Sequence, residues 1–203
     1  MGMDAELLYA WRRGDTQAGQ RLFRRYYEPV ARFFANKLRD PPADLVQETL
    51  MRCVKGRDQI REDSNFRSYL FGVAYRVLTD HLRAQYKTPD AIHSVSIQDL
   101  DPGPSTIIHR AQEAQLLVQA LRSIPLELQV ILELRYWERM NSTEISHVLD
   151  MPAATVRGRL RQGRQLLEDA LRKLAASPQV ALQTLSDIDA WAEKIREKMA
   201  QTP

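Results

Sequence analysis

Residues 141–174 read NSTEISHVLDMPAATVRGRLRQGRQLLEDALRKL, and this stretch decides the fold class. Asn141 followed three positions later by Glu144 has the spacing of a capping box, which favours a short helix directly after Asn141. The chain must then turn tightly at Asp150, before a second and much longer helix, Ala153–Leu174. The stretch therefore predicts two consecutive helices joined by a sharp turn.

The long helix has two contrasting faces. Its apolar face is formed by Val156, Leu160, Leu167, Leu171 and Leu174, and its other face by Ala153, Ala154, Arg157, Gly158, Arg161, Arg164 and Gln165. A helix that follows a tight turn and carries arginines on one side is typical of a recognition helix in the DNA major groove. A solvated charged face is the competing interpretation, but the small residues favour DNA because they let the backbone approach closely. Gly158 and Gly163 each cost a helix about 1 kcal/mol relative to alanine, which favours a compensating role.

A second helical block lies upstream. Two apolar series follow helical spacing, one of Leu22, Tyr26, Val30 and Phe33, the other of Leu70, Val73, Ala74, Val77, Leu78 and His81. Asp15 is placed to cap the earlier helix, and Pro125 to open another helix through Leu134. No alternating strand pattern with paired turn signals is present in the sequence. We therefore expect an all-α protein.

A linker separates the two helical blocks. Thr88–Ser105 contains three prolines and a glycine and has no helical period, and residues 88–109 hold three aspartates and no lysine or arginine. We expect an extended acidic linker with a short turn around Ile97–Leu100. The expected division is a first domain (1–87), the linker (88–109), a second domain (110–174) and a C-terminal helical extension (175–203).

Composition narrows the function classes. The net charge of +3 hides a clustering of 16 Lys or Arg against 11 Asp or Glu in residues 1–87, which favours an anionic partner. The single cysteine, Cys53, excludes an internal disulfide, and no signal peptide or apolar run of ~20 residues is found, so we expect a cytoplasmic protein without membrane insertion. No phosphate loop, zinc motif or nucleophile motif occurs, and the histidines lack ligand spacing. We expect no enzyme activity, cofactor, metal or small-molecule substrate.

Several segments together resemble bacterial sigma factors of the sigma-70 family. Ser123–Pro125, Val130–Tyr136, Glu144-Ile145 and Met151–Leu160 resemble region 4 of that family, and Asp44–Leu50 resembles region 2.2. Asn65–Leu70, Ala74 and Asp80–Arg83 resemble regions 2.3 and 2.4. The resemblance covers about residues 4–174, and the size matches the extracytoplasmic-function group. A helix-turn-helix alone would be weak evidence, whereas both halves in the correct order are specific.

The resemblance implies a function and its surfaces. Such a protein binds core RNA polymerase (through the β′ clamp helices and the β flap), recognises −35 and −10 promoter elements and promotes transcription initiation; an anti-sigma factor is a further partner known in the group. Polymerase would be bound by Asp44, Gln47 and Glu48. The −10 element would be bound by a loop and helix that include Arg61, Asn65, Phe66, Tyr69, Arg76 and Arg83. The −35 element would be bound by Ala153, Thr155, Arg157, Gly158, Arg161, Gln162 and Arg164.

Some residues depart from the family pattern. Gly19 stands where an aromatic residue is frequent, Tyr69 replaces a frequent tryptophan and Gly72 a frequent basic residue. Gly158 and Gln162 replace commoner serine and arginine in the recognition helix. The resemblance also implies that the linker runs toward the polymerase active-site cleft and RNA exit path, while a plain flexible tether is the alternative.

Two other functions remain open from the residues alone. One is a stand-alone helix-turn-helix repressor or activator, usually a dimer on a two-fold operator. The other is a protein-interaction module whose helices bind a regulator and never touch DNA. Asp44–Leu50 and Asn65–Arg83 favour the sigma factor, since a repressor needs neither a polymerase-binding helix nor a strand-melting loop. Beyond the family core, an apolar seam of Leu185, Ile188, Ala192, Ile195 and Met199 predicts one more helix that needs a packing partner.

Overall fold

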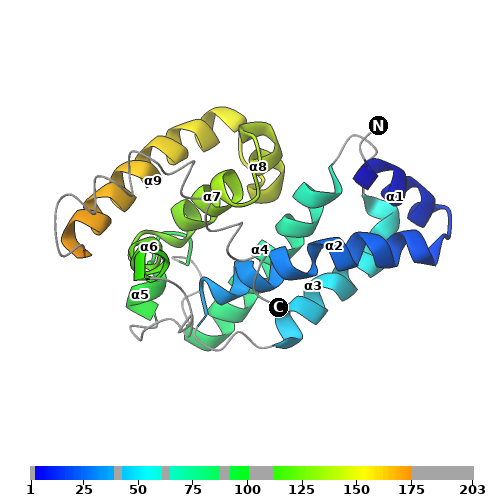
Figure 1. Cartoon of the computed structure of the whole chain (residues 1–203), viewed down its shortest axis with the longest axis horizontal. Helices are drawn as coiled ribbons and strands as arrows, with labels where there is room; N and C mark the ends of the chain where they lie inside the picture. The colour runs from blue at the N-terminus through cyan, green and yellow to red at the C-terminus, as the bar shows by residue number, and fades with distance from the viewer. Residues whose placement is uncertain (1–2, 39–42, 61–64, 87–91, 101–111, 175–203) are drawn as a thin grey trace.

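The computed structural model describes residues 3–38, 43–60, 65–86, 92–100 and 112–174 (Figure 1). The helices before the linker are α1 (Met3–Arg12), α2 (Thr16–Ala35), α3 (Ala43–Lys55), the 3-10 turn η1 (Arg57–Gln59) and α4 (Phe66–Tyr86). They are followed by α5 (Ile97–Leu100), α6 (Gln112–Arg122), α7 (Leu126–Tyr136), α8 (Ser142–Leu149) and α9 (Ala153–Leu174). Over these ranges the only β pairing is an isolated bridge between Ser96 and Pro125, so the all-α prediction is confirmed.

The predicted helix boundaries are confirmed where a capping residue sets them. The Asp15 carboxylate accepts hydrogen bonds from two backbone amides in the first turn of α2. Asn141 and Glu144 form the complete capping box at the start of α8, and Asp150 adopts a left-handed conformation (φ 52°) at its end. This conformation reverses the chain between α8 and α9. The helix-turn-helix therefore follows from local chemistry.

The N-terminal half, α1 to α4, is held together by aromatic packing. Trp11 of α1 lies directly against α2 at Gly19, where a Cβ atom would come within 2.4 Å of the indole ring. The aromatic residue that the family pattern places at position 19 is thus replaced by an indole from the neighbouring helix. Trp11 and Phe23 also contact the ring of Phe66, at centroid distances of 6.2 and 5.9 Å. Edge contacts of this kind stabilise a core beyond simple burial.

The C-terminal half, α6 to α9, has its own apolar cluster. Val156, Leu167 and Leu171 of α9 are buried as predicted, but Leu174 is 42% exposed, so its expected place in the core is wrong. Gly163 is buried against α7, and an added Cβ would lie 3.3 Å from Leu132. The compensating role of Gly163 is therefore close helix packing.

The described middle of the linker, residues 92–100, is more structured than expected. The predicted short turn is present as α5. The side chains of Ile92 and Ile97 are fully buried, however, whereas an extended linker would leave them exposed to solvent. The amide of Leu126 donates to the Val95 carbonyl (3.0 Å), and that of Glu127 donates to the His93 carbonyl (3.1 Å). Two isoleucines in a polar stretch are the signal that the linker prediction overlooked.

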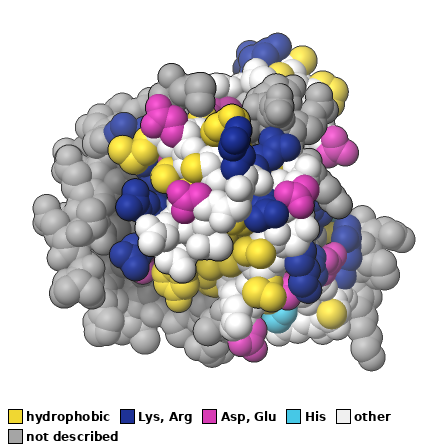
Figure 2. All heavy atoms as spheres, turned by 90° about the vertical axis from the view of Figure 1, so that its right-hand side faces the viewer, with side chains coloured by type: hydrophobic (Ala, Val, Ile, Leu, Met, Phe, Trp, Pro, Cys, Tyr) yellow, Lys and Arg dark blue, Asp and Glu magenta, His cyan; other side chains and the backbone are white. Residues whose placement is uncertain are grey.

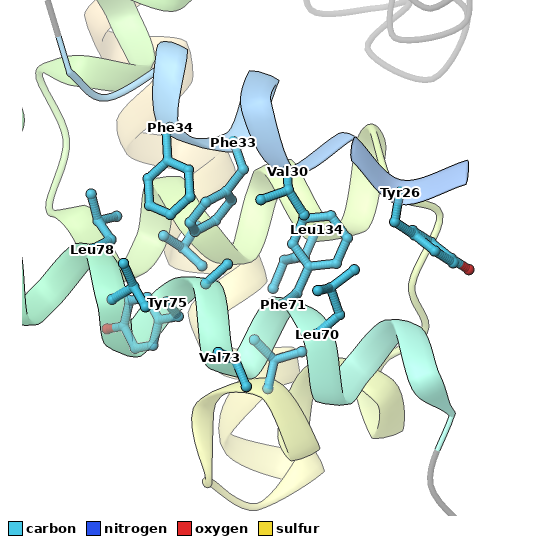
Figure 3. Close-up of a cluster of buried hydrophobic side chains, with 14 of the residues drawn as sticks. Tyr26, Val30, Phe33, Phe34, Leu70, Phe71, Val73, Tyr75, Leu78 and Leu134 are labelled. Carbon is cyan, nitrogen blue, oxygen red and sulfur yellow. The ribbon is translucent and has the colours of Figure 1, made fainter. Parts of the chain in front are cut away.

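The two halves pack against each other. Helix α4 contacts α3 on one side and α8 on another, so it is buried over more than the single apolar face that its sequence predicts. Figure 3 shows Leu134 of α7 among Val30, Phe71 and Leu70 of the N-terminal half. These residues belong to one continuous apolar cluster. Each helix in the described ranges is too short or too polar to span a lipid bilayer.

Candidate nucleic-acid interface

The first half of α9 presents the predicted recognition face. Arg157, Arg161 and Arg164 line an open surface groove together with Leu160, Gln165 and Glu168. Thr155, Gly158 and Gln162 are also exposed, while Ala153 is half-buried at the start of the helix. Nothing lies within 4 Å of a Cβ atom added to Gly158, so this glycine leaves open space on the face. The structure thus brings the predicted −35 residues together on one accessible surface.

The arginines of α9 differ in their contacts within the protein: some interact with neighbouring side chains, and others form no ion pair in the described part of the chain. The Arg164 guanidinium lies over the Tyr136 ring, 5.9 Å from its centroid, which orients it by a cation–π contact. Arg159 pairs with Glu127 of α7 at 3.2 Å, on the side of α9 away from the groove. Within the described part of the chain, Arg157 and Arg161 form no ion pair. Two uncompensated guanidiniums about one turn apart suit bidentate pairing with base edges or phosphates.

The start of α4 carries a second polar site. Asn65 accepts a hydrogen bond from the Arg67 backbone amide (3.0 Å) and donates from its side-chain nitrogen to Glu144 of α8 (2.7 Å). Arg67 donates to the same carboxylate oxygen (2.9 Å) and to the Glu138 carbonyl (2.7 Å). Burial raises the pKa of Glu144, but the Asn141 amide and Arg67 outweigh it and hold this pKa below its ordinary value. Both polar groups of the Asn65 amide are therefore engaged.

Phe66 requires a correction. The sequence placed it among the residues that bind the −10 element, but it is 2% exposed and lies in the aromatic cluster with Trp11, Phe23 and Tyr26. The alternation of polar and aromatic residues at the start of a helix could not show which side faces the core. Phe66 therefore anchors the start of α4 in the core. Arg61, also predicted for this loop, lies outside the described residues.

The other residues of α4 predicted to bind the −10 element, Tyr69, Arg76 and Arg83, differ in exposure, and the neighbouring Tyr75 is part of the core. Arg76 is exposed, and Arg83 is half-buried, within 3.2 Å of the His93 ring nitrogen Nε2. Tyr75 is buried, and its hydroxyl lies 2.6 Å from the other ring nitrogen of His93, so it belongs to the core. Tyr69 is half-buried, and burial raises the pKa of its phenol. A Cβ atom on Gly56 would lie 2.1 Å from the Tyr69 hydroxyl, which means that the glycine makes room for the phenol.

Helix α3 presents the predicted polymerase-binding residues. Asp44, Gln47 and Glu48 are exposed at spacings of three and four, which places them on one side of the helix. Glu48 pairs with Arg52 at 2.7 Å, and Arg52 also pairs with Asp80 of α4 at 3.0 Å, so Glu48 is held in a short ionic network. Next to this network lie Met51 and Val54, two apolar side chains that are about half exposed and that were not predicted from the sequence. Their helical spacing from Gln47 was the signal.

At the end of the molecule that carries α1, the described side chains do not gather into a region of a single charge. Basic and acidic side chains are interleaved there, with apolar side chains between them (Figure 2). A surface with interleaved charges attracts a polyanion such as DNA only weakly. Its charged side chains are expected to be solvated or to form specific ion pairs. Among the described residues no group of three or more histidine, cysteine, aspartate or glutamate side chains is arranged to hold a metal ion.

Comparisons with known proteins agree with this arrangement. The family model for Sigma-70 region 2 matches residues 22–88, and the model for Sigma-70, region 4 matches residues 114–167. The chain is 25% identical over 183 residues to the ECF RNA polymerase sigma-E factors of Salmonella typhimurium and Escherichia coli strain K12, an alignment that covers 84% of this chain and 95% of theirs. The Haemophilus influenzae sigma-E factor is 24% identical over 182 residues, covering 84% of this chain and 96% of its own length.

Proposed function

The chain belongs to the sigma-70 family, in its extracytoplasmic-function group, and from this premise we propose how its surfaces divide the work of promoter recognition. As a sigma factor it interacts with core RNA polymerase and promoter DNA and promotes transcription initiation. One observation carries the division: the region 2 match covers α4 and the region 4 match covers most of the helix-turn-helix, and each presents a separate polar site. We assign residues 1–87 to region 2 and 110–174 to region 4.

We propose that α3 binds the β′ clamp helices through Asp44, Gln47 and Glu48. Exposed carboxylates on one side of a helix can pair with cations of a partner, and the half-exposed Met51 and Val54 add apolar area beside them. Protein interfaces combine an apolar centre with a polar rim in this way. The β flap is the proposed partner of region 4.

We propose that α9 reads the −35 element. Arg157 and Arg161 are exposed and free of ion pairs within the described residues, which leaves their donors available to guanine edges and phosphates. Thr155, Gly158, Gln162 and Arg164 lie on the same exposed side, and Ala153 lies at its start. The cation–π contact of Arg164 restricts its guanidinium, which lowers the entropic cost of binding.

We propose that the start of α4 captures a base of the melted −10 strand, with Asn65 as the hydrogen-bonding group. Flipping a base costs a few kcal/mol, which contacts with the extruded base must offset. Arg61 and Tyr69 would border that base, and Arg76 and Arg83 would follow the phosphate backbone. Phe66 supports the site from the core and does not touch DNA in this proposal.

The remaining proposals concern the location of the protein, a further partner, the linker and the C-terminal extension. Initiation by core polymerase takes place in the cytoplasm, and we propose that the chain acts there as a non-catalytic subunit. An anti-sigma factor is a compatible partner. The linker would run toward the RNA exit path, and the extension 175–203, which lies outside the described residues, would dock on the rest of the chain.

Holoenzyme assembly tests the proposal. Core polymerase and the full chain are mixed and separated by size-exclusion chromatography, and the complex is then challenged with an excess of a different sigma factor. We expect a complex with one copy of the chain, which the competitor displaces. A chain that elutes separately from core polymerase, or that binds without competition, would refute the assignment.

A further inference from the structure

An ion pair joins the flank of α9 to the neighbouring helix α7. The Nε nitrogen of Arg159 lies 3.2 Å from the carboxylate oxygen Oε1 of Glu127, a side chain that is only 18% exposed. This oxygen is buried and accepts no hydrogen bond within the described residues, so the Arg159 guanidinium compensates its charge. The pair therefore holds Arg159 toward α7.

Glu127 is itself fixed at the start of α7. It stands in the first turn of that helix, where the helix dipole favours a carboxylate. Its backbone amide donates to the His93 carbonyl at 3.1 Å, and the amide of Leu126 donates to the Val95 carbonyl at 3.0 Å. Helix α7 packs against α9 (Figure 1). The carboxylate thus reaches α9 from a helix end whose backbone is already hydrogen-bonded.

The held arginine contacts one of the residues proposed to read the −35 element. The Nη1 nitrogen of Arg159 donates to the side-chain oxygen of Gln162 at 3.4 Å, across a spacing of three residues along the helix. Gln162 is exposed, and within the described part of the chain its amide nitrogen has no hydrogen-bond partner. The acceptor of this amide is therefore engaged inside the protein, and its donors are available to DNA.

This arrangement changes which base a glutamine can recognise. A glutamine amide with both ends available pairs with adenine, because its oxygen accepts from N6 and its nitrogen donates to N7. The oxygen of Gln162 is turned to a guanidinium, which repels the amino group of adenine and attracts the O6 oxygen of guanine. Guanine offers two neighbouring acceptors, N7 and O6, to such donors.

We propose that Glu127, Arg159 and Gln162 act as one unit that selects guanine at one position of the −35 element. Gln162 touches the base, and Glu127 and Arg159 are positioning residues. Together Arg159 and Gln162 present donors only, as does a single arginine, the commoner residue at position 162 in the family pattern. The inference rests on the proposed function of α9.

Base preference at single positions tests this unit. Holoenzyme formed from core polymerase and the full chain transcribes a library of promoters with a randomised −35 element, each with a barcode in its transcribed region. Gln162→Ala identifies the position that residue 162 reads, because the preference there is lost. At this position we expect guanine in wild type, and a ratio of guanine to adenine that falls about fivefold or more in Arg159→Ala. Arg172→Ala, which breaks another exposed ion pair of α9, should change no position.

A Gln162→Arg background separates base selection from a structural role. Arginine presents its donors without help, so this variant should keep guanine, and adding Arg159→Ala to it should leave the ratio unchanged. If Arg159 merely supports the fold, its loss should weaken transcription equally in both backgrounds and at every position.

Two further variants examine Glu127. Glu127→Ala alone should shift the ratio toward adenine, because Arg159 is then free to move away from Gln162. The double variant Glu127→Ala, Arg159→Ala should show the full shift of Arg159→Ala. It also covers the case in which a buried carboxylate without its partner destabilises the single variant.

Several results would overturn the proposal. They are a wild-type preference for adenine at this position, a ratio that neither Arg159→Ala nor the double variant changes, and a uniform loss at all positions. A wild-type chain that directs no transcription from any member of the library would instead refute the proposed function, so the two failures are distinguishable.

Discussion

The Lys37 ammonium donates a hydrogen bond to the Glu133 carboxylate at 2.6 Å, although the two residues stand 96 positions apart. Lys37 is fully buried, Glu133 is nearly so, and the ammonium also donates to the Phe33 carbonyl (2.9 Å). Burial lowers the pKa of Lys37, and the Glu133 carboxylate opposes that shift. The pair therefore satisfies two charges that would be costly to bury singly, and it joins α7 to the chain just beyond α2.

Glu133→Leu should lower the free energy of unfolding by about 3–5 kcal/mol, because it leaves the Lys37 charge buried without its partner. The double variant Lys37→Met, Glu133→Leu should recover most of this loss, since it removes both charges. Urea denaturation followed by circular dichroism measures all three proteins. A single variant as stable as wild type, or a double variant less stable than the single, would show that the pair is not needed.

Replacing Arg157 or Arg161 by alanine should weaken use of the −35 element by roughly 1–3 kcal/mol each, the range for a lost bidentate base contact. Transcription from promoters with intact and scrambled −35 elements measures the effect. Core-polymerase binding should persist, because that surface lies mainly on α3. Arg172→Ala, at the far end of α9, is the matched control. Unchanged promoter selectivity in both Arg157→Ala and Arg161→Ala would show that this face of α9 does not recognise the −35 element.

The helix-turn-helix was predictable because its signals are local. The capping box of Asn141 and Glu144 and the turn at Asp150 act within a few residues, and the structure confirms them. The burial of α4 on a second side was not predictable, since it depends on α8 crossing at Gly72. A glycine within a helix does not reveal which distant backbone comes close to it.

Asn65→Ala should impair strand opening more than closed-complex formation, because its amide is proposed to act on an unstacked base. Permanganate footprinting of the holoenzyme on a promoter reports opening near −10, and a mobility shift reports the closed complex. Opening at the wild-type level would reduce Asn65 to a structural cap of α4.

Phe66→Ala should lower the stability of the fold, whereas Asn65→Ala should impair strand opening. Truncating a buried phenylalanine typically costs 3–5 kcal/mol of stability, and the ring of Phe66 contacts Trp11, Phe23 and Tyr26. A lower melting temperature with normal opening per folded molecule is expected. Unchanged stability together with lost opening would return Phe66 to the DNA-binding group.

Double substitution of Asp44 and Glu48 by arginine should reduce holoenzyme assembly, because it reverses the charge of the exposed side of α3. Pull-down of the β′ subunit measures the loss, and double substitution of the exposed Glu28 and Asp169 by arginine is a charge-matched control away from α3. Undiminished capture of β′ would count against this surface. Replacing the half-exposed Met51 and Val54 by serine should also weaken holoenzyme assembly, because it removes apolar area from the proposed interface.

The single thiol gives a pH-dependent prediction. Burial raises the pKa of Cys53 to about 12, from 9.0 in an exposed chain. The unfolded chain therefore ionises first, so this contribution to stability is complete below pH 9 and is lost as the pH rises toward 12. Cys53→Ala should lose less stability than wild type between pH 9 and 11 in denaturation curves. Parallel pH profiles for the two proteins would contradict the assigned burial.

The polar sites were only partly readable from the sequence. Helical spacing alone placed the arginines of α9 on one face, because that helix is exposed on one side. The partners of Asn65 and Arg67 come from residues more than 70 positions away, and no local pattern encodes such pairs. Phe66 was misplaced for a related reason, since the aromatic cluster that holds it is formed by α1 and α2.

Transcription with purified core polymerase on fragmented genomic DNA of the source organism shows whether the chain selects promoters. The 5′ ends of the transcripts are mapped with and without the full chain. We expect new start sites that appear only with the chain and share two sequence motifs at a fixed separation upstream. We also expect Arg157→Ala to alter preference at the distal motif alone. A set of start sites identical with and without the chain would show that the chain does not select promoters.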